Sequence, residues 1–208
     1  MVTFYVIRHG ETEANRGGIF QGHMDVPLSD KGRKQAELVA RALQDIHFDA
    51  VYTSDLSRAA ETARAIMEYQ DCGLISDRRL RELYGGNLQG LTQEQVSLNY
   101  PEFDRAFLAD RYNTRRPGGE SFADLDQRVA RAMEDIQRWN ADRACGATVA
   151  VVSHGGAIRS MLKTAEPDPL LIRQVVGNCT ISVLECDGGT WRTVKAGDGA
   201  HLLCLEEE

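Results

Sequence analysis

The chain has 208 residues, of which 42% are hydrophobic and 26% are charged, and its formal net charge at pH 7 is −7. This composition is typical of one sizeable globular domain, and the acidic balance disfavours a protein that binds nucleic acid. The five cysteines lie far apart and form no C-x-x-C pair, which disfavours a disulfide framework and a zinc site.

The N-terminal residues run straight into a predicted strand, without the basic region and apolar segment of a signal peptide. No stretch is long and apolar enough to predict a membrane span, so we expect a cytoplasmic protein. The hydrophobic periodicities predict, in chain order, a strand at 2–7, a helix from Ser29 or Asp30 to about 46, a strand at 50–53, a helix at about 56–69, helical segments broken by Pro101 at 92–112, a helix at about 121–140, a strand at 147–152, a helix at 157–163 and a hairpin at 179–195.

This alternation of strands and helices predicts a three-layer α/β fold, with a mainly parallel sheet and helices on both faces. The terminal hairpin is expected to add an antiparallel edge. No repeat, low-complexity tract or linker divides the chain, so we expect a single domain over residues 1–208. Residues 74–91 are predicted to be irregular, the broken helices at about 85–120 to form a small insertion, and Pro167 and Pro169 to mark a turn.

Two predicted strands end in similar polar motifs. Arg8-His9-Gly10 ends the first strand, and Ser153-His154-Gly155-Gly156 ends the strand at 147–152. Because ligands of α/β sheets bind at the carboxyl ends of the strands, the two imidazoles are expected to converge on one anion. A lone histidine in such a place is more often structural, but the repeated arrangement beside Arg8 favours a functional site.

A histidine with one unprotonated ring nitrogen can attack phosphorus as a nucleophile, and the transferring phosphoryl group then needs cations around its oxygens. Arg8 is one such cation. Arg58 falls in the first turn of the helix at about 56–69, where a helix N-terminus also favours anions. Protonation of the leaving group needs an acid, for which Glu82 is the candidate; Glu11 and Glu120 are rivals that the sequence does not rank.

These residues belong to a longer series of motifs, from Arg8-His9-Gly10-Glu11-Thr12 to Asp198-x-x-His201-Leu202, that resembles the histidine phosphatase superfamily, also called the phosphoglycerate-mutase-like family. The resemblance covers essentially the whole chain. It implies that His9 is the phosphorylated nucleophile and Glu82 the proton donor. It also implies that Arg8, Arg58 and His154 hold the phosphoryl oxygens, and that no metal or other cofactor is needed. The residues that it places along the phosphate or substrate pocket are Asn15, Gln21, Gly22 and Gly155.

The family contains mutases and phosphatases, and two departures bear on the choice. Phosphoglycerate mutases usually carry Arg-His after the acidic residue and Asn after the second His-Gly, where this chain has Leu83-Tyr84 and Gly156. The resemblance is therefore closer to the phosphatase branch. It implies a metal-independent phosphoric monoester hydrolase of the histidine acid phosphatase type, acting on a small phosphorylated metabolite. The alternatives are a phosphoglycerate mutase and, more remotely, a non-catalytic module that binds phosphorylated ligands. The sequence does not indicate an oligomeric state.

Other charged and aromatic residues are interpreted as structural. The basic group before Gly118 could reach a second anionic group of the substrate, but charge runs usually form a solvated face. We therefore predict that Arg111, Arg115 and Arg116 form a solvated helix end. His23 and His47 are predicted to lie at the surface, and Trp139 and Trp191 to pack against other side chains.

Overall fold

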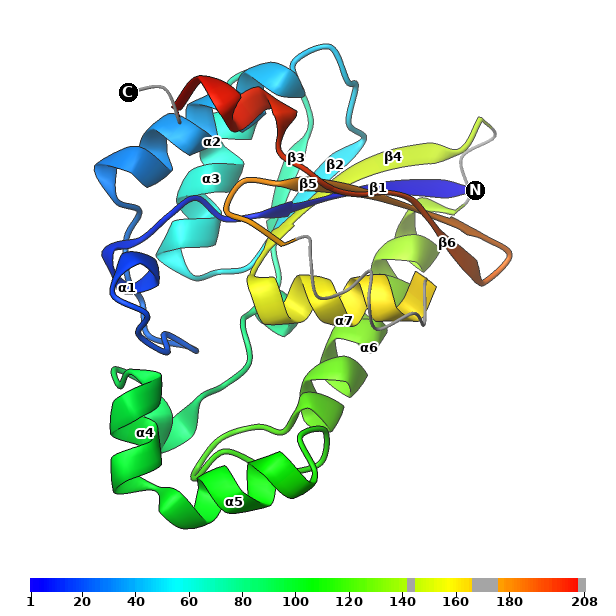
Figure 1. Ribbon diagram of the computed structural model, residues 1–208. Helices are drawn as coiled ribbons and strands as arrows, with labels where there is room; N and C mark the ends of the chain where they lie inside the picture. The colour runs from blue at the N-terminus through cyan, green and yellow to red at the C-terminus, as the bar shows by residue number, and fades with distance from the viewer. Residues whose placement is uncertain (142–144, 166–175, 206–208) are drawn as a thin grey trace.

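A computed structural model describes residues 1–141, 145–165 and 176–205, in which helices cover both faces of a six-stranded sheet (Figure 1). The strands are β1 (Val2–Arg8), β2 (Ala50–Thr53), β3 (Gly73–Ser76), β4 (Ala147–Ser153), β5 (Ile181–Asp187) and β6 (Thr190–Asp198). Their order is β3-β2-β4-β1-β5-β6; the pairs from β3 to β1 are parallel, whereas β5 runs antiparallel to both β1 and β6. The predicted α/β fold, mainly parallel with an antiparallel edge, is confirmed.

Two pairs of helices bury the two faces of the sheet (Figure 1). The helices in the described ranges are α1 (Glu13–Arg16), α2 (Asp30–Ala42), α3 (Ser57–Met67), α4 (Gln93–Asn99), α5 (Pro101–Ala109), α6 (Phe122–Asn140) and α7 (Gly155–Ala165). On one face, Val39 of α2 and Ile66 of α3 pack in a cluster with Phe48. On the other face, Leu125 of α6 and Met161 of α7 belong to a second cluster.

Side-chain caps fix where the helices next to the site begin. The Ser29 hydroxyl accepts a backbone N–H of the first turn of α2, which confirms the predicted start of that helix. Thr12 and Asn15 form a reciprocal capping box at α1. At α3, the Asp25 carboxylate accepts hydrogen bonds from the backbone N–H and the hydroxyl of Ser57, at 2.7 and 2.9 Å. These caps position both the loop around α1 and the first turn of α3.

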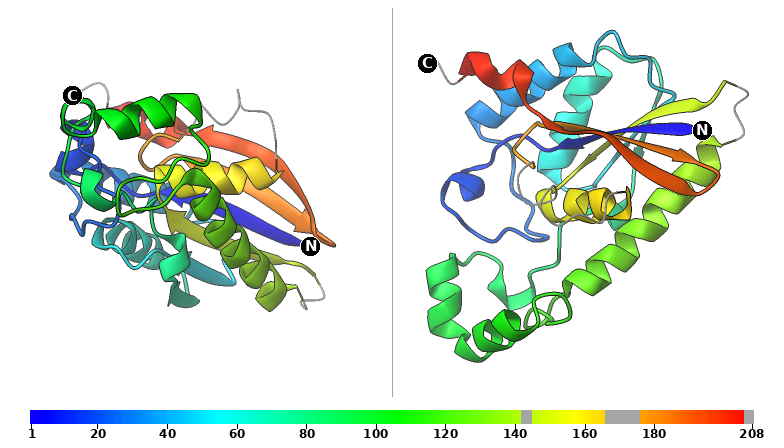
Figure 2. Two further views of the ribbon diagram at one scale, coloured as in Figure 1. Left: turned by 90° about the horizontal axis from the view of Figure 1, so that it is seen from below. Right: turned by 45° about the vertical axis from the view of Figure 1, so that its right-hand side comes forward.

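The helices α4 and α5, here called the cap, lie apart from the sheet, beyond the loop that carries α1 (Figures 1 and 2). Pro101 separates the two helices, as predicted. Phe20 joins that loop to the residues just before the cap: its N–H donates to the Leu91 carbonyl and its carbonyl accepts from the Gly90 N–H, both at 2.9 Å. The loop after α1 is therefore tied to the cap side of the molecule.

Some element boundaries differ from the prediction. Residues 73–76 form β3, although the sequence from residue 74 on was predicted to be irregular. A four-residue edge strand that is exposed throughout carries no burial pattern. Helix α7 begins at Gly155 rather than at Ala157, so the two glycines form its first turn instead of a loop. The turn predicted at Pro167 and Pro169 lies outside the described residues.

The two tryptophans behave differently. Trp191 packs against Phe4 with ring centroids 5.0 Å apart, as predicted. Trp139 stacks on Tyr52 at 6.5 Å but remains 58% exposed, so the packing role predicted for it is largely wrong. Across the described ranges, no helix combines the length and the hydropathy that crossing a bilayer requires.

Candidate active site

The structure brings the two strand-end histidines together. Because β1 and β4 are parallel neighbours, Arg8 lies opposite Ser153 in the register. The next residues, His9 and His154, are buried, and their ring centroids lie 5.0 Å apart. Each histidine directly follows its strand rather than ending it. The arrangement places two imidazoles at the edge where α/β sheets bind ligands.

The hydrogen bond of His9 defines its tautomer. Its Nδ1 lies 2.7 Å from the carbonyl oxygen of Gly10. A carbonyl can only accept, so Nδ1 carries the proton and Nε2 carries the lone pair. Burial, and then the nearby Arg58 and Arg8 cations, hold the pKa of His9 well below 6.5. The imidazole is therefore neutral at pH 7, and its unprotonated nitrogen is available as a nucleophile.

His154 is engaged at both nitrogens. Its Nδ1 accepts from Arg58 Nε at 3.2 Å, and its Nε2 lies 2.8 Å from the Ser54 hydroxyl oxygen. A guanidinium only donates, so Nδ1 is unprotonated and Nε2 donates to Ser54. Burial, and then Arg58, hold the pKa of His154 well below 6.5. His154 thus lies behind the cavity wall and supports Arg58 rather than facing the cavity.

Arg58 is an almost completely buried cation, 1% exposed, in the first turn of α3. Besides the bond to His154, it donates to the carbonyls of Gly22 and Met24 at 2.8 and 2.7 Å. Burial is the main cause that lowers its pKa to about 10, so it remains charged at pH 7. The loop of residues 22–24 is consequently held against α3 by the same guanidinium that lines the cavity.

Arg8 has an unused hydrogen-bond donor. Its Nη1 donates to the Val176 carbonyl at 2.6 Å, but its Nε is buried without a partner in the described part of the chain. A Cβ added to Gly155 would lie 3.5 Å from that nitrogen, so Nε sits beside the first turn of α7. A buried N–H without a partner is costly, and an anion at this point would satisfy it.

Glu82 lines the cavity together with His9, and Asp104 lines it from the cap. Its Oε1 accepts from its neighbour Leu83 N–H at 2.8 Å, and its Oε2 accepts from the Gly156 N–H of α7 at 3.0 Å. Its rivals lie elsewhere: Glu11 accepts from the Ser29 hydroxyl, and Glu120 pairs with Arg128 at 2.7 Å. Position therefore ranks the three carboxylates: Glu82 shares the cavity with His9, whereas Glu11 and Glu120 do not line it.

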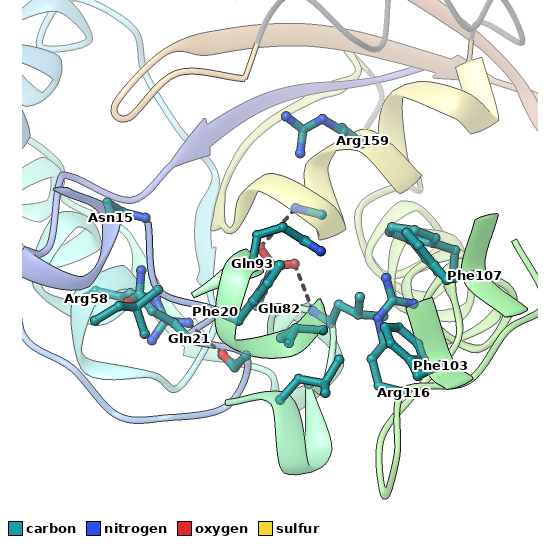
Figure 3. Close-up of a pocket in the computed structure, with 18 of the residues that line it drawn as sticks. Asn15, Phe20, Gln21, Arg58, Glu82, Gln93, Phe103, Phe107, Arg116 and Arg159 are labelled. Atoms are coloured by element: carbon teal, nitrogen blue, oxygen red, sulfur yellow. Dashed lines mark hydrogen bonds between the residues drawn. The ribbon is translucent and has the colours of Figure 1, made fainter. Parts of the chain in front are cut away.

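These groups face one cavity of about 430 Å³. The predicted site residues along its wall are Arg8, His9, Asn15, Gln21, Gly22, Arg58 and Glu82. His154 and Gly155 do not line it. Figure 3 shows Asn15 and Arg58 on one side, the cap residues Phe103 and Phe107 on the opposite side, and Glu82 between them. The structure thus places the polar site and the cap on two sides of the same space.

Two lining amides have unused polar atoms. The Oδ1 of Asn15 accepts from the N–H and the hydroxyl of Thr12 and from Asn178 Nδ2, so its amide nitrogen is the atom left for a ligand. The Oε1 of Gln21 is buried without a hydrogen-bond partner among the described residues. The Asn15 amide nitrogen and the Gln21 amide oxygen are therefore available to a ligand at the cavity wall.

The three arginines before Gly118, which the sequence predicted to form one solvated helix end, lie in different environments. Arg116 is only 8% exposed, lines the cavity, and lies over the rings of Phe122 and Phe107 at 4.3 and 5.1 Å. Burial lowers its pKa to about 10. The interpretation as a solvated helix end is wrong for Arg116, whereas the exposed Arg115 pairs with Asp124 at 2.7 Å. The exposed Arg111 lies over Phe107 at 5.3 Å.

Backbone contacts turn Arg116 inward. The Glu120 N–H donates to the Tyr84 carbonyl at 2.9 Å, and Cβ atoms added to Gly86 or Gly119 would collide with backbone of the opposite segment. Two segments distant in sequence therefore lie in direct contact.

The two histidines predicted to lie at the surface differ. The half-buried His23 places Nε2 2.7 Å from the Glu82 carbonyl, so its predicted surface position is wrong, whereas His47 is exposed as predicted.

Sequence reasoning missed two residues beside the site. Arg159 lines the cavity from α7, and its cation is one of the groups that lower the pKa of Arg8 after burial. It follows His154 by five residues, so its place near the start of a helix was a usable signal. Asn178 donates through Nδ2 to the His9 carbonyl at 2.9 Å and to Asn15 Oδ1 at 3.3 Å. No local pattern distinguishes Asn178, because its partners lie more than 160 residues away.

Replacing Asn178 with alanine should lower kcat by about tenfold, because the change removes one hydrogen bond from the His9 carbonyl and one from the Asn15 amide oxygen. Asn178→Asp keeps the shape but loses the donor, so we expect a similar loss. Steady-state assays with p-nitrophenyl phosphate, together with thermal unfolding, would measure both effects. Unchanged kcat in both variants would show that these hydrogen bonds do not position the site.

The two buried imidazoles should make the fold sensitive to acid. Each has a folded-state pKa below 6.5, so below about pH 6.5 the unfolded chain binds protons that the folded chain excludes. The free energy of unfolding should therefore decrease as the pH is lowered below about 6.5, by up to about 1.4 kcal/mol per pH unit for each histidine. Urea unfolding at pH 7.5 and 5.5 would measure this slope. His154→Gln should reduce the slope and the exposed His47→Gln should not; equal slopes in all three proteins would contradict the prediction.

Comparisons with known proteins agree with this arrangement. The family model of the histidine phosphatase superfamily (branch 1) matches residues 4–199. Phosphoglycerate mutase-like protein 4 of Arabidopsis thaliana is 39% identical over 203 residues, which cover 95% of this chain and 85% of that protein. Phosphoserine phosphatase 1 of Hydrogenobacter thermophilus is 36% identical over 163 residues, 77% and 74% of the two chains. The solved structure of Bacillus stearothermophilus YhfR matches with a TM-score of 0.87 and 29% identity, covering 97% of this chain and 100% of that chain.

Proposed function

This chain belongs to the histidine phosphatase superfamily, and from that premise we propose that it is a phosphomonoesterase in which His9 carries the phosphoryl group. Membership in the family and the phosphatase among its relatives support an enzyme that hydrolyses phosphate esters. The proposed role of His9 rests on its neutral imidazole, whose unprotonated Nε2 lies in a cavity that His9 shares with Arg8, Arg58 and Glu82.

In the proposed first step, His9 Nε2 forms a bond to phosphorus while the bond from phosphorus to the ester oxygen breaks. The electron pair of that bond goes to the leaving oxygen, which takes a proton from Glu82. The Gly10 carbonyl, 2.7 Å from Nδ1, stabilises the positive charge that develops on the imidazole. Arg8 and Arg58 stabilise the charge on the phosphoryl oxygens, which is the main catalytic requirement of phosphoryl transfer.

In the second step, water attacks phosphorus and the bond from nitrogen to phosphorus breaks, with its electron pair returning to His9. The Glu82 carboxylate accepts the proton of the water and so regains the proton that it lost in the first step. In this proposal His154 acts through Arg58, to which it is hydrogen-bonded. Asn15, Gln21 and Gly22 contact the phosphoryl group or the substrate, Gly155 adjoins the phosphate subsite, and residues 1–208 act as a single domain.

We propose that guanidinium groups supply the positive charge and that the reaction uses no metal. Release of inorganic phosphate from p-nitrophenyl phosphate, measured in excess chelator, tests this. The same assay over a panel of small phosphorylated metabolites would identify the substrate. Loss of all activity in chelator, restored by one divalent cation, would overturn the metal-independent proposal. Tight vanadate binding without turnover of any ester would instead indicate a module that only binds phosphorylated ligands.

Phosphoglycerate mutase is the second candidate, favoured by the name of the relative that is 39% identical. A mutase shares the nucleophile but returns the phosphoryl group to a different oxygen of the bound intermediate. Incubation with 3-phosphoglycerate distinguishes the two activities. Release of inorganic phosphate supports the phosphatase, and formation of 2-phosphoglycerate supports the mutase.

A further inference from the structure

The cap side of the cavity presents a wall of aromatic rings. Phe103 and Phe107, one turn apart on α5, stack with centroids 5.4 Å apart, and Phe107 lies 6.2 Å from Phe122 at the start of α6. All three line the cavity, and Phe20, 43% exposed, lines it from the loop after α1. We call Phe103, Phe107 and Phe122 the aromatic wall.

The aromatic wall lies at the margin of the hydrophobic core: Phe122 packs against one core cluster, whereas Phe103 and Phe107 belong to neither cluster. Helix α5 contains no buried residue, and its apolar face is only partly covered, at Phe107, by the side chains of Phe122, Arg111 and Arg116. Phe103 and Phe107 are half-buried and line the cavity, whereas Leu108, the residue after Phe107, is 72% exposed and does not line it. When an apolar ligand covers an aromatic face that is open to a cavity, the burial of apolar surface makes the free energy of binding more favourable.

The wall is also held in place before any ligand binds. The Arg116 guanidinium lies over Phe122 and Phe107, and cation–π contacts of this kind restrict the rings. On the loop side, the two backbone hydrogen bonds of Phe20 fix its main chain. A preformed apolar site loses little entropy on binding, so it discriminates strongly between ligands.

We propose that the alcohol part of the substrate carries a flat apolar group, such as an aromatic ring, which lies against the aromatic wall. This inference rests on the proposed phosphatase function, because the phosphoryl group at His9 and Arg58 anchors one end of the ester in the same cavity. Esters of small polar acids, such as phosphoserine and 3-phosphoglycerate, bury no apolar surface there. They are therefore poorer substrates than aryl-alkyl esters.

Two esters of similar primary alcohols, 3-phenylpropyl phosphate and n-propyl phosphate, isolate this contribution because their leaving groups are chemically alike. The expected kcat/KM ratio in favour of the phenylpropyl ester is about 30-fold. Phe107→Ala should reduce the ratio by about tenfold. Leu108→Ala removes a neighbouring apolar side chain outside the cavity and should leave the ratio unchanged. Because the wild-type ratio alone decides the question, the test stands even where a cap variant fails to fold.

The outcomes separate this inference from the function on which it rests. Hydrolysis of both esters that depends on His9, with a ratio near one, would overturn the aromatic subsite and leave the phosphatase intact. Calorimetry with the two corresponding phosphonates provides a readout without turnover. Tighter binding of the phenylpropyl phosphonate without hydrolysis of either ester would support the subsite and overturn the phosphatase. Equal binding without hydrolysis would overturn both.

Discussion

Replacing His9 with alanine should lower kcat for p-nitrophenyl phosphate by at least about 10⁴-fold, because the proposed mechanism passes through a covalent bond between His9 Nε2 and phosphorus. The arginines and the Glu82 carboxylate would remain, and they alone give little acceleration without a covalent step. Steady-state phosphate release from wild-type protein and variant would measure the loss, and circular dichroism would establish that the variant is folded.

The covalent intermediate gives this prediction a second readout. Brief mixing of wild-type protein with ³²P-labelled substrate should leave a phosphoryl group that is labile in acid and stable in alkali, and His9→Ala should take up none. The exposed His47→Ala is the matched control and should behave like wild type. Label on Ser54 or Ser153, or activity of His9→Ala within tenfold of wild type, would show that another group is the nucleophile.

Replacing Glu82 with glutamine should affect poor leaving groups most. For an alkyl phosphate we expect kcat to fall by about 10²- to 10⁴-fold, the usual contribution of a general acid, whereas p-nitrophenyl phosphate should lose much less in its first step. p-Nitrophenolate leaves without a proton, so the ratio of the two losses reports proton donation rather than binding. Measurement of kcat for both esters, with wild type and Glu82→Gln in parallel, gives that ratio.

Gly156 offers an independent test of the same carboxylate. A Cβ at this position would collide with Glu82 Oε1, so Gly156→Ala should displace the acid without removing it. The expected pattern is again a larger loss with the alkyl ester. Gly199→Ala is the control, because its Cβ would meet no atom closer than 3.5 Å. Equal losses for both esters in Glu82→Gln and Gly156→Ala would contradict a role as proton donor.

The fold and the polar end of the cavity were accessible from sequence because their signals are local. His9 and His154 each directly follow a buried strand, and parallel pairing of β1 with β4 brings such positions together. Arg58 comes five residues after the end of β2, in the first turn of α3. A buried strand, a glycine just after it and a helix that follows can each be recognised from a few neighbouring residues.

The cap side was not accessible, because its geometry depends on contacts between distant segments. The inward position of Arg116 follows from the approach of residues 84–87 to residues 116–120, and no pattern around Arg116 reports that approach. The aromatic wall likewise combines Phe107 of α5 with Phe122 of α6. The exposed edge strand β3 was not predicted for a different reason: none of its four residues is buried, so the strand has no buried face that a hydrophobic pattern could report.

The loop after α1 is anchored at both of its ends, and this affects how such enzymes can diversify. One end is bound by the Arg58 guanidinium through the carbonyls of Gly22 and Met24, and the other by the backbone pairing of Phe20 with residues 90 and 91. A chimera that exchanged α4 and α5 together with residues 90 and 91 would replace the partners of Phe20 and so alter the second attachment. Exchange of specificity between relatives should therefore require residues 19–24 to be transplanted together with the helices.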